Sequence, residues 1–169
     1  MTGRPHTAFA AVALALTALG ALGALATLAW PVPAAALYPQ RPQPTLAGTP
    51  AEVVDILAAN VSMLALPLLF VGAAGGRPGP WRIAGDLATA AIVAVNSVAV
   101  GAALALNGTA LLAYLPHLPV EAAALALTCS TWLCQRNHRG PLAKVFLAVV
   151  ALAAAAALIE VYATPHTAR

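Results

Sequence analysis

The sequence predicts an all-α membrane protein, a polytopic helical bundle with about five transmembrane helices. Three observations predict it. The chain of 169 residues is 62% hydrophobic and only 8% charged, and its mean hydropathy is +0.87. Apolar runs of about 20 residues recur, the length that a helix needs to cross a hydrocarbon core of about 30 Å. Ala and Leu dominate these runs, which favours helices over the alternating pattern of a membrane β-barrel.

The first apolar segment follows Arg4 and resembles a signal peptide, since the small residues at 33–36 look like a cleavage site. Its apolar core is longer than the roughly 7–15 residues of a signal sequence, so we expect a retained span. Six prolines at 31–50 predict an extended outer loop. Short Gly/Pro-containing connections at 75–80 and 135–141 separate later segments. A single integral membrane domain, residues 1–169, is therefore predicted, with spans at about 8–30, 51–75, 86–106, 119–134 and 142–163.

Basic residues are distributed unequally between the predicted loops. Cytoplasmic loops of membrane proteins carry an excess of Lys and Arg, so the richer side should be the inner one. With the N-terminus inside, the inner side holds Arg4, Arg77, Arg82, Arg136, Arg139 and Lys144, and the outer side holds Arg41 and Arg169. We therefore predict an inner N-terminus, an outer C-terminus and a location in a cell membrane, the bacterial cytoplasmic membrane being favoured. Because the bases are scattered, they do not predict nucleic-acid binding.

Two carboxylates in apolar segments are the most informative polar residues. A carboxylate in or near the hydrocarbon layer is costly unless it is neutralised, paired or bound to metal. Glu121 has a local explanation: with Pro119 as the first helical residue and Leu118 as the cap, it faces the positive end of the helix dipole. Glu160 ends the last span, where free carbonyls disfavour an anion. The predicted orientation places both at the outer face, at the depth of His117.

His117, Glu121 and Glu160 can therefore meet. One His and two carboxylates are a plausible ligand set for zinc or another divalent metal, and in an enzyme Glu121 and Glu160 are the candidate catalytic residues. A proton-sharing polar cluster and unrelated solvated residues are the alternatives, since no metal-binding motif such as HEXXH is present. Asn60 and Asn96 are expected to be structural polar residues that form interhelical hydrogen bonds, each stabilising the packing by roughly 0.6–2 kcal/mol.

Taken in order, these residues resemble the pattern of the stage II sporulation protein M superfamily. The matching segments, from about residue 51 to about residue 165, are Asn60 in LAANVSML, Asn96 in NSVAVG, His117 and Glu121 in PHLPVEAAALAL, and Glu160 in AALIEVYATP. The sequence departs from the pattern at Leu118 and Ser97, where the family has Gly. The resemblance implies importance for the five polar residues. Members are multi-pass proteins of larger machineries, and small ones occur with circular bacteriocin systems.

We expect a multi-pass membrane component of a machinery for peptide maturation, secretion or cell-envelope remodelling. No nucleotide-binding loop or nucleophile–base motif is apparent. An intramembrane metal-dependent peptidase or peptide-cyclising enzyme is the alternative, and a proton-coupled carrier or immunity protein is a second one. The expected partners are the lipid bilayer, other membrane proteins of the same system and a hydrophobic peptide substrate, with a homo-oligomer also open.

Overall fold

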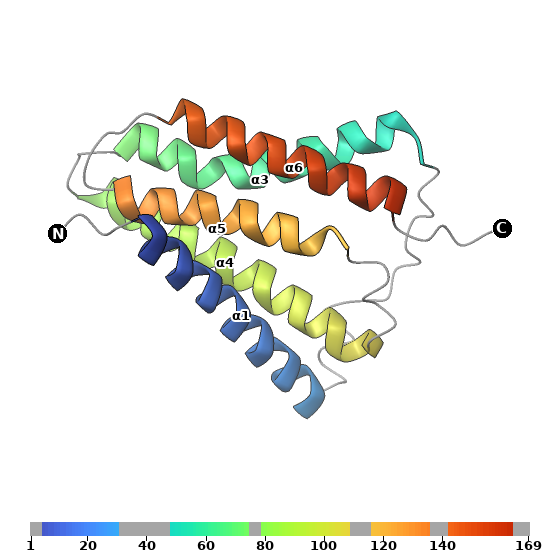
Figure 1. The fold of residues 1–169 in the computed structure, drawn as a ribbon. Coiled ribbons are helices and arrows are strands. Elements are labelled where there is room, and N and C mark those ends of the chain that lie inside the picture. Colours follow the sequence, from blue (N-terminus) through green and yellow to red (C-terminus); the bar gives the residue numbers. More distant parts are fainter. Residues whose placement is uncertain (1–4, 31–47, 75–78, 109–115, 136–141, 164–169) are drawn as a thin grey trace.

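The computed structural model describes residues 5–30, 48–74, 79–108, 116–135 and 142–163. Across these ranges the regular structure is helical, which confirms the predicted all-α class. The helices run alternately in opposite directions along one bundle (Figure 1). The five helices are α1 (Pro5–Ala29), α3 (Pro50–Ala74), α4 (Pro80–Asn107), α5 (Leu118–Gln135) and α6 (Ala143–Ala163). The predicted proline-rich loop at 31–50 and the connections at 75–80 and 135–141 lie largely outside the described residues.

Local sequence signals explain where α3 begins. Thr49 and Glu52 form a capping box, in which the backbone N–H of Thr49 donates to Glu52 Oε2 at 2.8 Å. The N–H of Glu52 donates to Thr49 Oγ1 at 3.4 Å in return. Pro50 occupies the first helical position, where its missing N–H costs nothing.

The helix that contains the third predicted span, 86–106, starts before that span does. Helix α4 begins at Pro80, six residues before the expected Asp86. Gly79 precedes it with a φ of 105°, a conformation that favours glycine. The apolar run does not include this first turn because the turn contains Arg82. A transmembrane helix can extend beyond its apolar run where its end lies in water.

Four of the described helices are long and apolar enough to cross a membrane. They are Pro5–Ala29, Pro50–Ala73, Pro80–Leu106 and Ala143–Ala163. Helix α5, the predicted span at 119–134, does not meet the same criterion of length and composition. It carries the buried hydroxyl residues Thr128, Ser130 and Thr131, each of which donates to a carbonyl of its own helix. Such bonds satisfy hydroxyls that a core position would otherwise leave unpaired.

Helix α5 is the centre of the bundle and contacts all four other helices. Eight of its 18 residues are buried. Small side chains such as Ala124 and Cys129 let its neighbours approach closely, and they join one apolar core with Leu64 of α3 and Val149 of α6. Burial inside the bundle explains why α5 tolerates a more polar composition than the lipid-facing helices do.

A second contact cluster surrounds Trp132 at the C-terminal end of α5. The indole is fully buried, and its Nε1 donates to Asp86 Oδ1 of α4 at 2.9 Å. The ring of Phe70 meets it edge-on, with centroids 6.2 Å apart. Gly85 lies directly against the indole, so that a side chain there would collide with the ring. This cluster joins α3, α4 and α5 at the end of the bundle opposite the start of α5.

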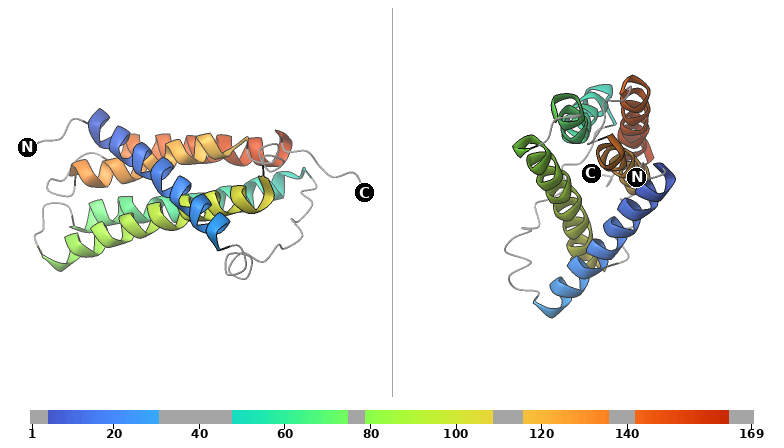
Figure 2. Two further views of the ribbon diagram at one scale, coloured as in Figure 1. Left: turned by 90° about the horizontal axis from the view of Figure 1, so that it is seen from below. Right: turned by 90° about the vertical axis from the view of Figure 1, so that its left-hand side faces the viewer.

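Helices α1 and α4 cross in close backbone contact (Figure 2). Three glycines make the approach possible. A Cβ on Gly23 would lie 2.9 Å from the Cα of Val98, and one on Gly101 would collide with the carbonyl oxygen of Gly20. Small residues at crossing points are the usual means by which membrane helices approach.

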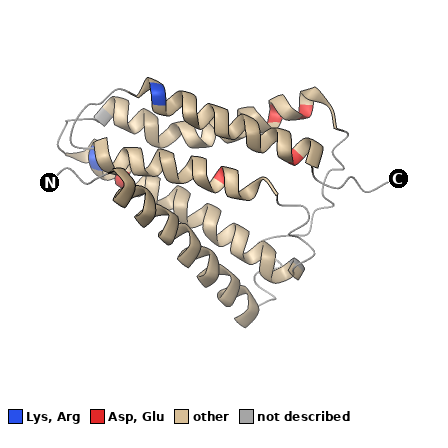
Figure 3. Ribbon diagram, viewed as in Figure 1, with Lys and Arg blue, Asp and Glu red and all other residues tan. Residues whose placement is uncertain are grey.

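The described charges separate between the two ends of the bundle (Figure 3). Arg82 and Lys144 belong to the first turns of α4 and α6, which start at the same end. Four of the five acids lie near the other end, at the start of α3, the start of α5 and the end of α6: Glu52, Asp55, Glu121 and Glu160. The other bases that we used to predict orientation lie outside the described residues.

Candidate functional site

The turn that starts α5 positions the first two residues of the site. The carbonyl of His117 accepts hydrogen bonds from the N–H groups of Val120 at 3.0 Å and Glu121 at 3.1 Å. His117 is therefore the residue just before the helix, and Leu118 is the first helical residue. The expectation that Leu118 caps the helix was wrong by one position. The hydrogen bond from the Glu121 N–H to the His117 carbonyl closes one helical turn between these two residues, so their side chains, four residues apart, lie on the same side of α5.

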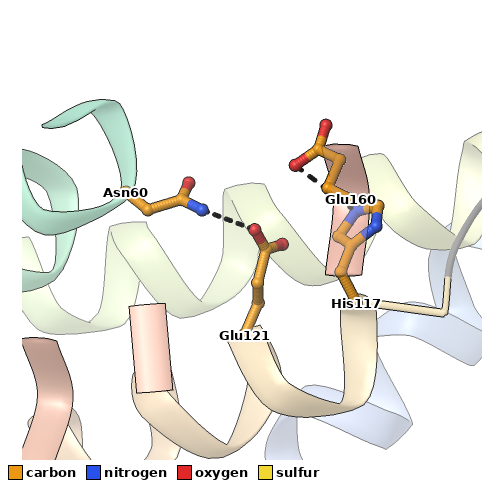
Figure 4. Close-up of polar contacts among 4 residues, drawn as sticks. All are labelled: Asn60, His117, Glu121 and Glu160. Atoms are coloured by element: carbon orange, nitrogen blue, oxygen red, sulfur yellow. Dashed lines mark hydrogen bonds and ion pairs between the residues drawn. The ribbon is translucent and has the colours of Figure 1, made fainter. Parts of the chain in front are cut away.

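The last turn of α6 supplies the third residue. Glu160 Oε2 lies 4.0 Å from Nε2 of His117. One ligand atom each from His117, Glu121 and Glu160 can be chosen so that all three lie within 4.8 Å of one another. Figure 4 shows the imidazole directed toward Glu160, with the carboxylate of Glu121 beside the pair. The expectation that these residues meet is confirmed.

Asn60 connects the site to α3. Its Nδ2 donates to Oε1 of Glu121 at 2.6 Å (Figure 4). This is the interhelical hydrogen bond that we expected of an amide in a membrane span. It also fixes the orientation of the Glu121 carboxylate, as outer partners of metal-binding carboxylates do. Three helices, α3, α5 and α6, thus converge on the site.

His117 is buried, with 7% of its surface exposed, whereas 29% of the Glu160 side chain remains accessible. Nδ1 of His117 is buried and has no hydrogen-bond partner among the described residues. A buried polar nitrogen without a partner costs about 1–3 kcal/mol. The other ring nitrogen, Nε2, is the one that faces Glu160.

The donor set fits a divalent cation. An imidazole and two carboxylates are ligands that zinc accepts, and together they supply two negative charges when His is neutral. In a tetrahedral site with bonds of about 2.1 Å, ligand atoms lie about 3.4 Å apart. The present spacing of up to 4.8 Å therefore requires the side chains to move inward by rotation. Three protein ligands leave the fourth position of such an ion open.

Asn96 does not take part in this cluster. Its Nδ2 donates to the carbonyl of Ile92, in its own helix, at 2.8 Å. Among the described residues, the expected interhelical bond of Asn96 is not formed. Asn96 instead lies in the wall of a cavity between α1, α4 and α5, whose wall also includes Glu121. The sequence analysis missed this cavity, although the small residues Gly20 and Gly101 that border it were a usable signal.

No family model, no curated protein and no solved structure matches this chain. The resemblance to the stage II sporulation protein M superfamily therefore stays a prediction.

Proposed function

We propose that this chain is a multi-pass membrane component of a machinery that matures or exports an apolar peptide, and that His117, Glu121 and Glu160 bind a divalent metal ion. The observation that carries the metal site is the convergence of three potential ligand atoms within 4.8 Å. The approach of His117 Nε2 to Glu160 Oε2 at 4.0 Å and the hydrogen bond that Asn60 donates to Glu121 support it. The four long apolar helices support a bilayer environment.

Helix α5 is the fifth span in this proposal. It contacts all four other described helices, so that it would cross the membrane largely surrounded by protein instead of lipid. Polar residues in it are therefore tolerated. We place the Arg82 and Lys144 end in the cytoplasm and the His117 end outside, because basic residues favour the cytoplasmic side. The separation of the described charges supports this orientation.

A metal-dependent intramembrane peptidase is the second candidate, and one observation favours it. Glu121 belongs both to the three-residue cluster and to the wall of the cavity. A group bound in that cavity would lie beside the metal. A zinc ion held by His117, Glu121 and Glu160 would supply Lewis-acid chemistry for hydrolysis of a peptide bond.

An apolar reporter peptide distinguishes the two candidates. The purified chain, loaded with zinc, is reconstituted in liposomes with the peptide, and the peptide is followed by mass spectrometry. Time-dependent cleavage or ring closure that disappears in Glu160→Gln supports the peptidase. A peptide that stays intact while it binds the protein supports the non-catalytic component. A peptide that neither binds nor reacts contradicts both.

Glu52→Gln is the matched control for Glu160→Gln. It makes the same chemical change at the same end of the bundle, and Gln serves in a capping box as Glu does. It should leave the peptide reaction or binding unchanged.

A further inference from the structure

Helices α1, α4 and α5 border a cavity of about 470 Å³, and Met63 of α3 also lines it. This volume falls in the range of roughly 300–1,000 Å³ that is usual for pockets that bury a small ligand. Most of the lining is aliphatic, with Leu16, Val100 and Leu125 among the residues that form it. The cavity therefore suits a mainly apolar molecule.

The polar atoms in the wall are mostly acceptors. Thr17 Oγ1 donates to the carbonyl of Ala13 and Ser97 Oγ donates to that of Val93, so both hydroxyl hydrogens are already used. Asn96 donates one amide hydrogen to the carbonyl of Ile92, which leaves its Oδ1 as an acceptor and its second amide hydrogen as the one remaining side-chain donor among these groups. Glu121 adds a carboxylate.

Among the described residues that line the cavity there is no Lys, Arg or His. A ligand headed by a carboxylate or phosphate would therefore meet acceptors and negative charge without a cation to pair with it. A protonated amino group is cationic and carries only hydrogen-bond donors, so it would be stabilised by the same acceptors and by the Glu121 carboxylate.

We propose that this cavity binds the amino-terminal end of an apolar peptide. The α-ammonium group lies near Glu121 and Asn96, and the first side chains pack against α1 and α4. A peptide fits better than a long-chain amine because the acceptors are spread over three helices, α1, α4 and α5. A peptide offers a series of N–H donors to them, whereas an alkylamine offers a single head group.

This inference rests on the proposed function and names the substrate class of that site. Because Glu121 contributes to both, a bound amino terminus would place the first peptide bond beside the three-residue cluster. The position of the bound amino terminus would then determine which peptide bond lies next to the metal.

Binding to the metal-free protein tests the proposal. The chain is placed in phosphatidylcholine nanodiscs and treated with EDTA, and trileucine amide with a carboxyl-terminal fluorophore is the probe. We expect the free amino terminus to bind at least roughly tenfold more tightly than the N-acetylated peptide, since a hydrogen bond to a charged group contributes that much. Equal affinity of the two peptides would overturn the proposal. Dodecylamine that competes as strongly as the peptide would also overturn it, in favour of a lipid amine.

Two kinds of variant locate the binding. Asn96→Leu removes an acceptor and should weaken binding of the free-amine peptide and leave binding of the acetylated one nearly unchanged. Ala122→Phe and Ala21→Phe each place a ring in the cavity from a different helix, and both should abolish binding. Having two filling variants keeps the test valid if one of them does not fold. Leu147→Ala, on an exposed face of α6, is the control. Unchanged binding in a folded cavity-filling variant would contradict the location.

The metal proposal can fail separately. His117 does not line the cavity, so His117→Ala should lose zinc and keep peptide affinity in the metal-free assay. Zinc binding without peptide binding would refute the present inference alone. Peptide binding without zinc binding would refute the metal site alone.

Discussion

The imidazole Nε2 of His117 lies 4.0 Å from Oε2 of Glu160, and this contact joins the start of α5 to the end of α6. The partner explains why a carboxylate is tolerated in the last turn of an apolar helix, where the helix dipole disfavours it. Glu121, one turn along α5, brings a second carboxylate to the same point. Two anions beside one buried imidazole form a site that a divalent cation would stabilise.

Replacing Asn60 with Leu should weaken both the fold and the metal site. The hydrogen bond to Glu121 joins α3 to α5, and its loss should lower the free energy of unfolding by about 0.6–2 kcal/mol. The carboxylate would also lose its orienting partner, and metal affinity should fall roughly 10–100-fold. Zinc titration by calorimetry measures the affinity. Ser62→Ala is the control, because that hydroxyl bonds only a carbonyl of its own helix. Unchanged zinc affinity in Asn60→Leu would show that Asn60 does not support the site.

The α1–α4 crossing should not tolerate a methyl group at Gly101. The added Cβ would collide with the carbonyl of Gly20, and backbone atoms cannot move aside cheaply. We expect Gly101→Ala to destabilise the protein by roughly 1–3 kcal/mol. Melting followed by a thiol-reactive dye measures this in a Cys134→Ser background, because Cys129 is then the one remaining cysteine and is buried in the folded protein.

Gly72→Ala is the matched control for that substitution. A Cβ there would have no neighbouring atom within 4 Å. The change should raise stability by up to about 1 kcal/mol, since Ala favours a helix over Gly. Equal melting temperatures for the Gly101 and Gly72 variants would contradict the proposed crossing.

Trp132→Phe should affect stability and leave the metal site intact. The substitution removes the hydrogen bond to Asp86, and bonds to charged groups contribute about 1.5–3 kcal/mol. Trp132 belongs to the C-terminal end of α5, whereas the site lies at its start. The melting temperature should therefore fall while zinc affinity stays the same. A loss of zinc affinity in the folded variant would mean that the two ends are coupled.

The orientation can be tested with single cysteines. Ala51→Cys lies at the start of α3 and Ala143→Cys at the start of α6, at opposite ends of the bundle. In intact cells, a membrane-impermeant maleimide should label the first variant and not the second, with the unsubstituted chain giving the background. Labelling of Ala143→Cys alone would reverse the proposed topology.

Hydropathy alone predicted where helices would form, because a long apolar segment in a bilayer must satisfy its backbone hydrogen bonds internally, which a helix does. It did not predict how far α4 extends beyond its apolar run, since the helix also includes the turn with Arg82. It also did not distinguish α5 from the other predicted spans, although α5 is the buried centre of the bundle. Composition measures apolarity and does not distinguish lipid from protein neighbours.

The meeting of Glu121 and Glu160 was predictable from depth, since α5 and α6 run in opposite directions. The contact between Asn60 and Glu121 was not predictable, because it depends on how each helix is rotated about its axis. For the same reason, the hydrogen bond between Trp132 and Asp86 was not predictable. Rotation is set by packing of small residues across pairs of helices, and a single sequence does not say which pairs touch.

The zinc content of the purified chain tests the central claim most directly. The protein is incubated with zinc and dialysed, and its metal content is measured by elemental mass spectrometry. It should hold about one zinc ion per chain. His117→Ala and Glu160→Gln should each lose most of it, while Glu52→Gln should retain it. A folded wild-type protein with no bound zinc, or variants that hold as much zinc as the wild type, would contradict the account.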